Sequence, residues 1–108
     1  MIVDAVSEKK GQNITVIDLR DITTAPCDFF VICSASSKIK INAIADNIER
    51  IMLNKINQSI WNQEGRDSNW RLIDFGNIVI HIFKSEIREY YNLEELWGDG
   101  KIEKIKLT

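Results

Sequence analysis

The sequence contains few of the residues that build metal sites. It has one histidine, His81, and two cysteines, Cys27 and Cys33, among its 108 residues. The cysteines form no CxxC pair and have no histidine nearby, which argues against both a zinc site and a disulfide framework. Cys33 lies inside an apolar run, where a free thiol behaves as a small hydrophobic side chain. We therefore expect neither a metal nor a cofactor.

Membrane and nucleic-acid signals are also absent. No segment approaches the ~20 consecutive apolar residues that cross a bilayer, and residues 1–10 lack the basic start and apolar core of a secretory signal. The net charge is −2, whereas nucleic-acid binders need a basic surface for phosphate contacts. These absences predict a cytoplasmic protein whose RNA contact is at most peripheral, through Lys101, Lys104 and Lys106.

Motifs for phosphate chemistry are missing as well. The sequence has no glycine-rich phosphate loop and no Walker lysine. It also lacks an Asp-x-Asp pair that could hold catalytic magnesium. These absences weigh against an enzyme, and a small nucleotide-binding or hydrolytic enzyme is kept as the alternative function.

What is present is typical of one globular domain, with 44% hydrophobic and 28% charged residues. The patterns predict a helix over 1–10, strands over 14–19 and 28–35, a polar loop over 21–26, a helix over 37–56 and a short strand over 58–63. With the elements that follow, this order predicts an α/β fold, a mixed β-sheet with packed helices.

The helix over 37–56 has the clearest periodicity in the chain. The residues expected to face the core are Ile41, Ile44, Ala45, Ile48, Ile51 and Met52. Ile39 and Leu53 fall on the opposite side, where single exposed apolar residues are common. Ser36 and Ser37 are candidates for the helix cap.

A β-hairpin is predicted over residues 70–83. Trp70–Phe75 and Ile78–Phe83 are rich in β-branched and aromatic residues, and Gly76-Asn77 between them suits a two-residue turn. The register pairs Phe75 with Ile78, Leu72 with His81, and Trp70 with Phe83. Because side chains alternate between faces, one face should lie on the core, namely Arg71, Ile73, Phe75, Ile78, Ile80 and Ile82. The other face is mixed, with Trp70, Leu72, Asp74, Val79, His81 and Phe83.

Two short helices are expected after the hairpin. Ser85 is a good N-cap, and Glu86 and Glu89 fall in the first turns, where the helix dipole favours acids. Asn92 can end this helix and cap a second one, with Glu95 three residues on as in a capping box. Leu93, Leu96 and Trp97 predict an apolar face. Residues 98–108 form a loose tail or, over 101–107, a final strand.

The hairpin and these helices support two interpretations. In the predicted register His81 lies diagonally across from Asp74, which is half of a general-base arrangement, but no nucleophile motif accompanies it. Tyrosine and tryptophan are the usual anchors of protein interfaces, although each one taken singly is more often a core residue. The aromatics in question are Trp70, Tyr90, Tyr91 and Trp97. The aromatics are interleaved with acids, Glu86, Glu89, Glu94, Glu95 and Asp99, which favours a surface for a basic protein partner and no catalytic residue.

Several segments occur in a specific order between about residue 14 and Trp97. They are DFFVICSASS, NAIAD, EG, WRLIDFGNIVIHIF and the pattern E-x-R-x-Y-Y-x-L-E-x-L-W. In this order and spacing they resemble the ribosomal silencing factor family, also called the Iojap family. The resemblance implies a nucleotidyltransferase-like fold that has lost its catalytic residues, and a protein that is not an enzyme.

The resemblance also implies a partner and a mechanism. Members of that family bind ribosomal protein fourteen of the large subunit, on the face that meets the small subunit. They thereby block subunit joining sterically and repress translation when nutrients are short. Large-subunit proteins are basic, which agrees with the acidic segment found here. Members can also form homodimers when free.

Partner-binding positions carry over residue by residue. The interface strand of the family matches Trp70, Asp74, Phe75 and Gly76, and its acidic-aromatic motif matches Glu86, Arg88, Tyr91, Leu93, Glu94 and Trp97. Asp28 and Ser37 match positions expected to be structural. Asn77 stands where the family usually has aspartate, and Ile39 where it often has arginine, so a partner contact from that helix face is not implied.

Overall fold

The computed structural model describes residues 1–105. Its elements in chain order are α1 (Ile2–Glu8), β1 (Gln12–Asp18), β2 (Phe29–Ala35), α2 (Lys38–Ile56), β3 (Asn62–Glu64), β4 (Trp70–Asp74), β5 (Ile78–Lys84), α3 (Arg88–Tyr91), α4 (Leu93–Leu96) and β6 (Lys101–Lys104). The strands form one six-stranded sheet in the order β3-β4-β5-β2-β1-β6. β2 and β5 are parallel, and the other neighbours are antiparallel. The predicted α/β class with a mixed sheet is confirmed.

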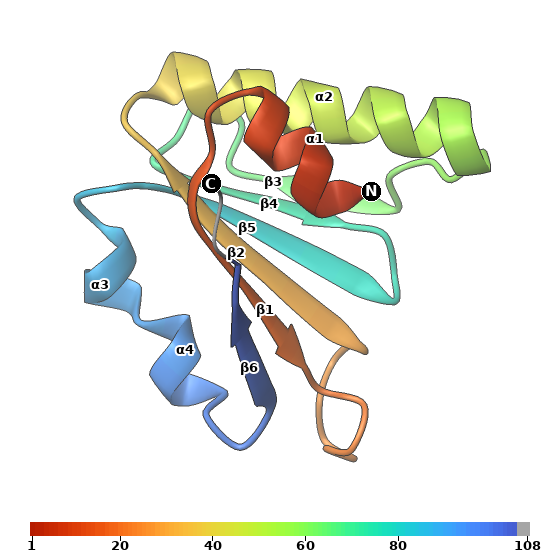
Figure 1. Cartoon of the computed structure of the whole chain (residues 1–108), viewed down its shortest axis with the longest axis vertical. Helices are drawn as coiled ribbons and strands as arrows, with labels where there is room; N and C mark the ends of the chain where they lie inside the picture. Colours follow the sequence, from red (N-terminus) through yellow and green to blue (C-terminus); the bar gives the residue numbers. More distant parts are fainter. Residues whose placement is uncertain (106–108) are drawn as a thin grey trace.

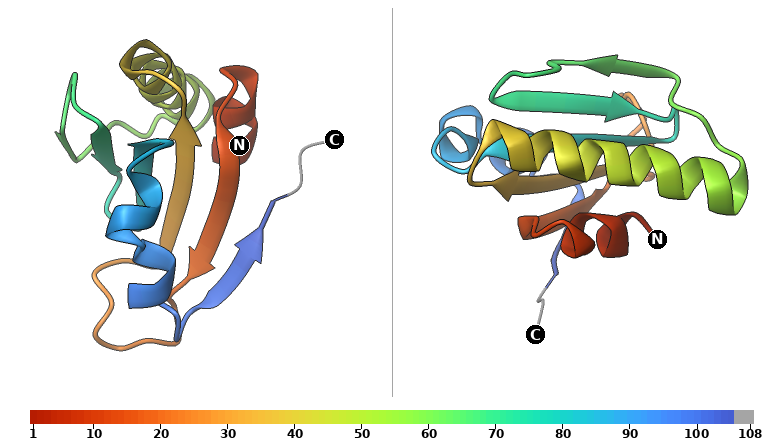
Figure 2. Two further views of the ribbon diagram at one scale, coloured as in Figure 1. Left: turned by 90° about the vertical axis from the view of Figure 1, so that its left-hand side faces the viewer. Right: turned by 90° about the horizontal axis from the view of Figure 1, so that it is seen from above.

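Helices cover both faces of this sheet. α1 and α2 lie along one face, and the short helices α3 and α4 lie on the opposite face (Figures 1 and 2).

No helix within residues 1–105 combines the length and the apolar character that a membrane crossing requires.

The larger core lies between the sheet and α2. All the residues of the predicted apolar stripe are buried there, namely Ile41, Ile44, Ala45, Ile48, Ile51 and Met52. Ile39 and Leu53 are exposed, as predicted. The helix begins after Ser37, whose Oγ accepts a hydrogen bond from the Lys40 N–H at 3.2 Å, and ends at Asn57 in the left-handed conformation.

The hairpin has the predicted register. Trp70 pairs with Phe83 and Leu72 with His81, and the Phe75 N–H donates to the Ile78 carbonyl at 2.9 Å. Gly76 has a φ of 95°, which glycine adopts without the steric cost of a Cβ. The face expected on the core contributes Ile73, Phe75, Ile80 and Ile82 to the larger core.

The mixed face of the hairpin belongs to a second, smaller core. Val79 and Phe83 are buried there with Ile17, Leu19, Phe30 and Ile32. Trp70, Leu72, Leu93 and Trp97 pack against them and are half-buried. The short helices therefore cover this face only in part.

Two boundary predictions are wrong. The short strand expected over 58–63 begins only at Asn62, because Gln58 still bonds back to the Met52 carbonyl as part of the end of α2. Ser85 does not cap α3. Its N–H donates to the Ala35 carbonyl at 2.9 Å in the turn that follows β5, and the helix begins only at Arg88.

The predicted capping box of α4 is also wrong in detail. Asn92 does end α3 and precede α4, but its side-chain oxygen accepts no backbone N–H of α4. Its Nδ2 instead donates to the Glu95 carboxylate at 2.5 Å. Leu96 is 71% exposed, so only Leu93 and Trp97 form the expected apolar face. β6 provides the final strand, and the predicted positions 106 and 107 lie outside the described residues.

Candidate partner-binding surface

An aromatic cluster joins the sheet to α3. The Trp70 ring stacks on Phe83 with centroids 4.9 Å apart and lies 4.6 Å from the ring of Tyr91. Phe83 is buried, Trp70 is half-buried and Tyr91 is 44% exposed. The cluster therefore runs from the second core to the surface, and its outer part consists of Trp70 and Tyr91.

The buried imidazole of His81 contacts this cluster through a hydrogen bond. Its Nδ1 accepts a hydrogen bond from Trp70 Nε1 at 3.1 Å. The predicted His81–Asp74 interaction is wrong, because Asp74 Oδ1 accepts from the Gly76 N–H at 2.7 Å within the hairpin turn. Burial lowers the pKa of His81 to about 4, so the ring is neutral near pH 7. The general-base arrangement considered from the sequence is not formed.

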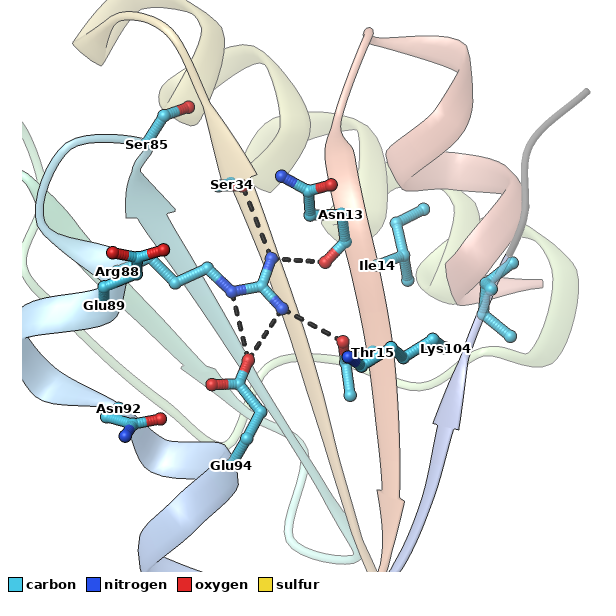
Figure 3. A pocket seen from close by; sticks show the side chains of 11 residues that line it. Asn13, Ile14, Thr15, Ser34, Ser85, Arg88, Glu89, Asn92, Glu94 and Lys104 are labelled. Atoms are coloured by element: carbon cyan, nitrogen blue, oxygen red, sulfur yellow. Dashed lines mark hydrogen bonds and ion pairs between the residues drawn. The ribbon is translucent and has the colours of Figure 1, made fainter.

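A polar network holds α3 and α4 on the sheet (Figure 3). Arg88 bonds Glu94 Oε1 through Nε at 3.1 Å and through Nη2 at 2.7 Å. Its guanidinium also donates to Thr15 Oγ1 and Ser34 Oγ at 3.0 and 3.4 Å, and to the Asn13 carbonyl. We call Arg88, Glu94, Asn13, Thr15 and Ser34 the Arg88 network. It ties both short helices to β1 and β2.

A cavity of about 450 Å³ lies beside this network (Figure 3). It is lined by Asn13, Ile14, Thr15, Ser34, Ser85, Arg88, Glu89, Asn92, Glu94, Lys104 and Ile105. The lining includes no residue of the aromatic cluster. Within residues 1–105, no group of three or more His, Cys, Asp and Glu side chains is arranged to hold a metal ion.

The residues predicted to bind a partner separate into two groups in the structure. Trp70, Asp74, Gly76, Glu86 and Tyr91 are exposed or partly exposed, and we call them the aromatic-acidic surface. Asp74 and Gly76 lie at the end of β4 opposite to Trp70 and the α3 side.

The other predicted residues point inward. Phe75 is 6% exposed in the larger core, and the side chains of Arg88 and Glu94 are 12% and 24% exposed. Leu93 and Trp97 pack on the second core, where Trp97 lies 5.7 Å from the Phe30 ring. These side chains hold the scaffold of the surface and offer a partner little area.

Sequence reasoning missed some contributors. The Trp70–His81 bond was not predicted, although the register placed both Trp70 and Asp74 diagonally to His81. Leu96 on α4, 71% exposed, adds a large side chain that was not expected at the surface. Tyr90 on α3, 84% exposed, belongs to the aromatic set expected to form a binding surface but was not among the positions carried over from the family.

Comparison with known proteins identifies the family. Residues 1–108 match the family model described as "Ribosomal silencing factor during starvation". Ribosomal silencing factor RsfS of Halalkalibacterium halodurans is 36% identical over 101 residues, which cover 93% of this chain and 85% of the relative. The Bacillus subtilis protein of the same name is 34% identical over 99 residues, covering 91% of this chain and 82% of that protein.

A solved structure agrees with these matches. The crystal structure of a Chromobacterium violaceum protein aligns with a TM-score of 0.81 and 26% identity, covering 90% of this chain and 80% of that one. The sequence match extends over the whole chain and includes the segments that form the aromatic-acidic surface. The chain belongs to the ribosomal silencing factor family.

Proposed function

We propose that this chain binds the large ribosomal subunit through ribosomal protein fourteen and blocks joining of the small subunit, which represses translation. Family membership supports a role in ribosome silencing. The single observation that carries the proposed contact is the outer part of the aromatic cluster, in which the partly exposed rings of Trp70 and Tyr91 lie 4.6 Å apart on a fixed scaffold. Rigid aromatic anchors of this kind dominate the energy of protein interfaces.

The acidic side chains of the aromatic-acidic surface fit a basic partner. Asp74 and Glu86 belong to the aromatic-acidic surface. Glu86 forms a loose pair with Lys84 at 3.7 Å, while Arg88 is paired with Glu94 at 2.7 Å. A surface with this charge accelerates encounter with a basic ribosomal protein and makes the association sensitive to salt. The buried area around Trp70 then determines how long the complex lasts.

The proposed mechanism is occlusion. The described chain measures 33 × 33 × 29 Å, so a bound molecule occupies space that the small subunit needs when the two subunits meet. No covalent chemistry is required. The enzymatic alternative gains no support from His81, whose Nδ1 is occupied by Trp70. The same proposal places the protein in the compartment of its ribosomes, the cytoplasm, and allows a homodimer when it is free.

Co-sedimentation with purified large subunits tests the contact. Trp70→Ala is expected to weaken binding about 30-fold, as for an interface anchor worth about 2 kcal/mol. Asp74→Asn removes the charge and keeps an acceptor for the Gly76 N–H, so it isolates the electrostatic contribution. Ile39→Ala is the control, because Ile39 is 82% exposed and lies on α2, on the face of the sheet opposite to α3 (Figure 2). Unchanged binding of both the Trp70 and the Asp74 variants would contradict the proposal.

A further inference from the structure

The hydrogen bond between Trp70 and His81 fixes the state of both rings. An indole Nε1–H can only donate, so the Nδ1 of His81, 3.1 Å away, must carry the lone pair. A neutral imidazole with a free lone pair on Nδ1 has its proton on Nε2. Trp70 in turn has no second polar atom on its side chain. Its only hydrogen-bonding group is therefore satisfied inside the molecule.

This arrangement has a cost for the folded state. His81 is 5% exposed, and its Nε2 is buried with no hydrogen-bond partner among residues 1–105. A buried donor without an acceptor destabilises a protein, whereas an apolar side chain of similar size would not. The neighbours of His81 are themselves apolar rings, Phe30 at 4.9 Å and Phe83 at 6.2 Å. Core packing alone therefore does not explain a histidine at this position.

Within residues 1–105, the one hydrogen bond of the His81 side chain is with a residue of the aromatic-acidic surface, Trp70. We propose that His81 is a positioning residue for partner binding, which holds the Trp70 indole in one orientation by accepting its N–H. The inference rests on the proposed function and adds to it a residue that no partner can touch directly. His81 affects the partner only through the orientation of Trp70, because His81 itself is buried beneath that ring.

The bond also limits the chemistry of the partner. Because the Trp70 N–H is already used, the accessible part of this ring offers only carbon atoms and the π-system. The partner group that meets Trp70 is then an aliphatic side chain or the stem and cation of an arginine or lysine, and not a carbonyl or carboxylate acceptor. A basic protein supplies such side chains in abundance.

Substitutions of His81 in two backgrounds test the proposal. His81→Leu fills the space but accepts no hydrogen bond, whereas His81→Asn places an acceptor oxygen near the position of Nδ1. Each is made in the wild-type chain and in Trp70→Phe, whose ring has no N–H. Affinity for purified large subunits is measured for all of them, together with urea unfolding. The indole N–H resonances of ¹⁵N-labelled protein are recorded, with Trp70 assigned by its absence in Trp70→Phe.

His81→Leu is expected to weaken binding about tenfold, the value of one hydrogen bond that orders an anchor, and to shift the Trp70 N–H resonance. His81→Asn should restore most of the affinity. In the Trp70→Phe background, His81→Leu should have no further effect on binding, because the bond is already absent. Should His81→Leu prove unfolded, His81→Phe, which keeps a ring but accepts no hydrogen bond, replaces it in the two backgrounds.

Several results would overturn the proposal. An equal loss in both backgrounds would show that His81 acts independently of the Trp70 N–H. A loss of affinity that only follows a loss of folded protein would make His81 a structural residue. An unshifted Trp70 resonance in His81→Leu would show that the bond does not form in solution. Failure of the wild-type chain to bind would instead contradict the proposed function, while the resonance still reports separately on the bond.

Discussion

Arg88 and Glu94 form an ion pair of 2.7 Å that closes α3 onto α4. Neither helix has a fully buried residue, and each spans only one turn, so propensity alone cannot hold them. The same guanidinium reaches Thr15 on β1 and Ser34 on β2. The Arg88 network therefore positions Tyr91, which lies between the two paired residues in the sequence, against Trp70.

Breaking this network is expected to destabilise the short helices. Arg88→Met keeps the aliphatic stem and removes the charge, leaving the mostly buried Glu94 carboxylate without a partner. We expect a loss of about 2 kcal/mol in the free energy of unfolding, measured by urea denaturation, and faster proteolysis within residues 85–97. Glu86→Gln is the control, because its pair with Lys84 is 3.7 Å long and exposed and should change stability by less than about 0.5 kcal/mol. Equal effects of the two variants would contradict this role.

Acid should weaken the fold through His81. Burial lowers the pKa of His81 from 6.5 to about 4, so between these values the unfolded chain binds a proton that the folded chain does not. The stabilisation is complete above pH 6.5, falls as the pH decreases, and amounts to a loss of about 3 kcal/mol by pH 4.

Urea unfolding of the wild type and His81→Leu at several pH values measures this effect. The difference in stability between the two proteins should change in favour of the variant from pH 6.5 to pH 4. Asp18, whose pKa is lowered to about 2 by its bond with Arg20, responds only below its ordinary pKa of 3.8. A pH-independent difference between wild type and variant would show that His81 titrates normally in the folded state.

Two isoleucines of α2 should behave in opposite ways. Ile48 is fully buried, and Ile48→Ala should cost about 3 kcal/mol through lost burial and the cavity left behind. Ile39 is 82% exposed, and Ile39→Ala should change stability by less than about 0.5 kcal/mol. Thermal or urea unfolding of the two variants measures both changes in stability. A large loss for Ile39→Ala would mean that this face of α2 is covered in solution.

Association with the proposed partner should depend on salt. Raising the ionic strength from about 0.1 M to about 1 M shortens the Debye length from about 10 Å to about 3 Å, and we expect the association rate to fall about tenfold. Stopped-flow or surface-binding kinetics with purified ribosomal protein fourteen measures it, while the dissociation rate changes less. The double variant with Asp74→Asn and Glu86→Gln should show a weaker dependence. The same salt dependence in the double variant would assign the attraction to other charges.

Local patterns in the sequence were sufficient for much of the fold. The stripe of α2 was predictable because its spacing repeats over several turns, and all its members are buried. The register of β4 and β5 follows from a two-residue turn that allows little else. The parallel pairing of β2 with β5 and the position of β6 next to β1 depend on contacts between distant segments, which no local pattern specifies.

The candidate site was predictable by residue type but not by side-chain partner. The sequence indicated the aromatic and acidic residues, yet it paired His81 with Asp74. In the structure His81 accepts a hydrogen bond from Trp70, and Asp74 accepts one from Gly76 in the turn. Trp70 and Asp74 both lie diagonally to His81, but Asp74 Oδ1 accepts the Gly76 N–H instead of contacting His81. Likewise, Arg88 was expected to bind the partner. Its bonds to Asn13 and Thr15 could not be predicted, because they join residues far apart in the chain.

A subunit-joining assay tests the central claim most directly. Purified large subunits are incubated with the chain before small subunits are added, and the fraction of joined ribosomes is measured by sedimentation. The wild-type protein should reduce joining in proportion to its occupancy of the large subunit. Trp70→Ala at the same concentration should not, and Ile39→Ala should act like the wild type. Joining that is unaffected by saturating wild-type protein would contradict the account.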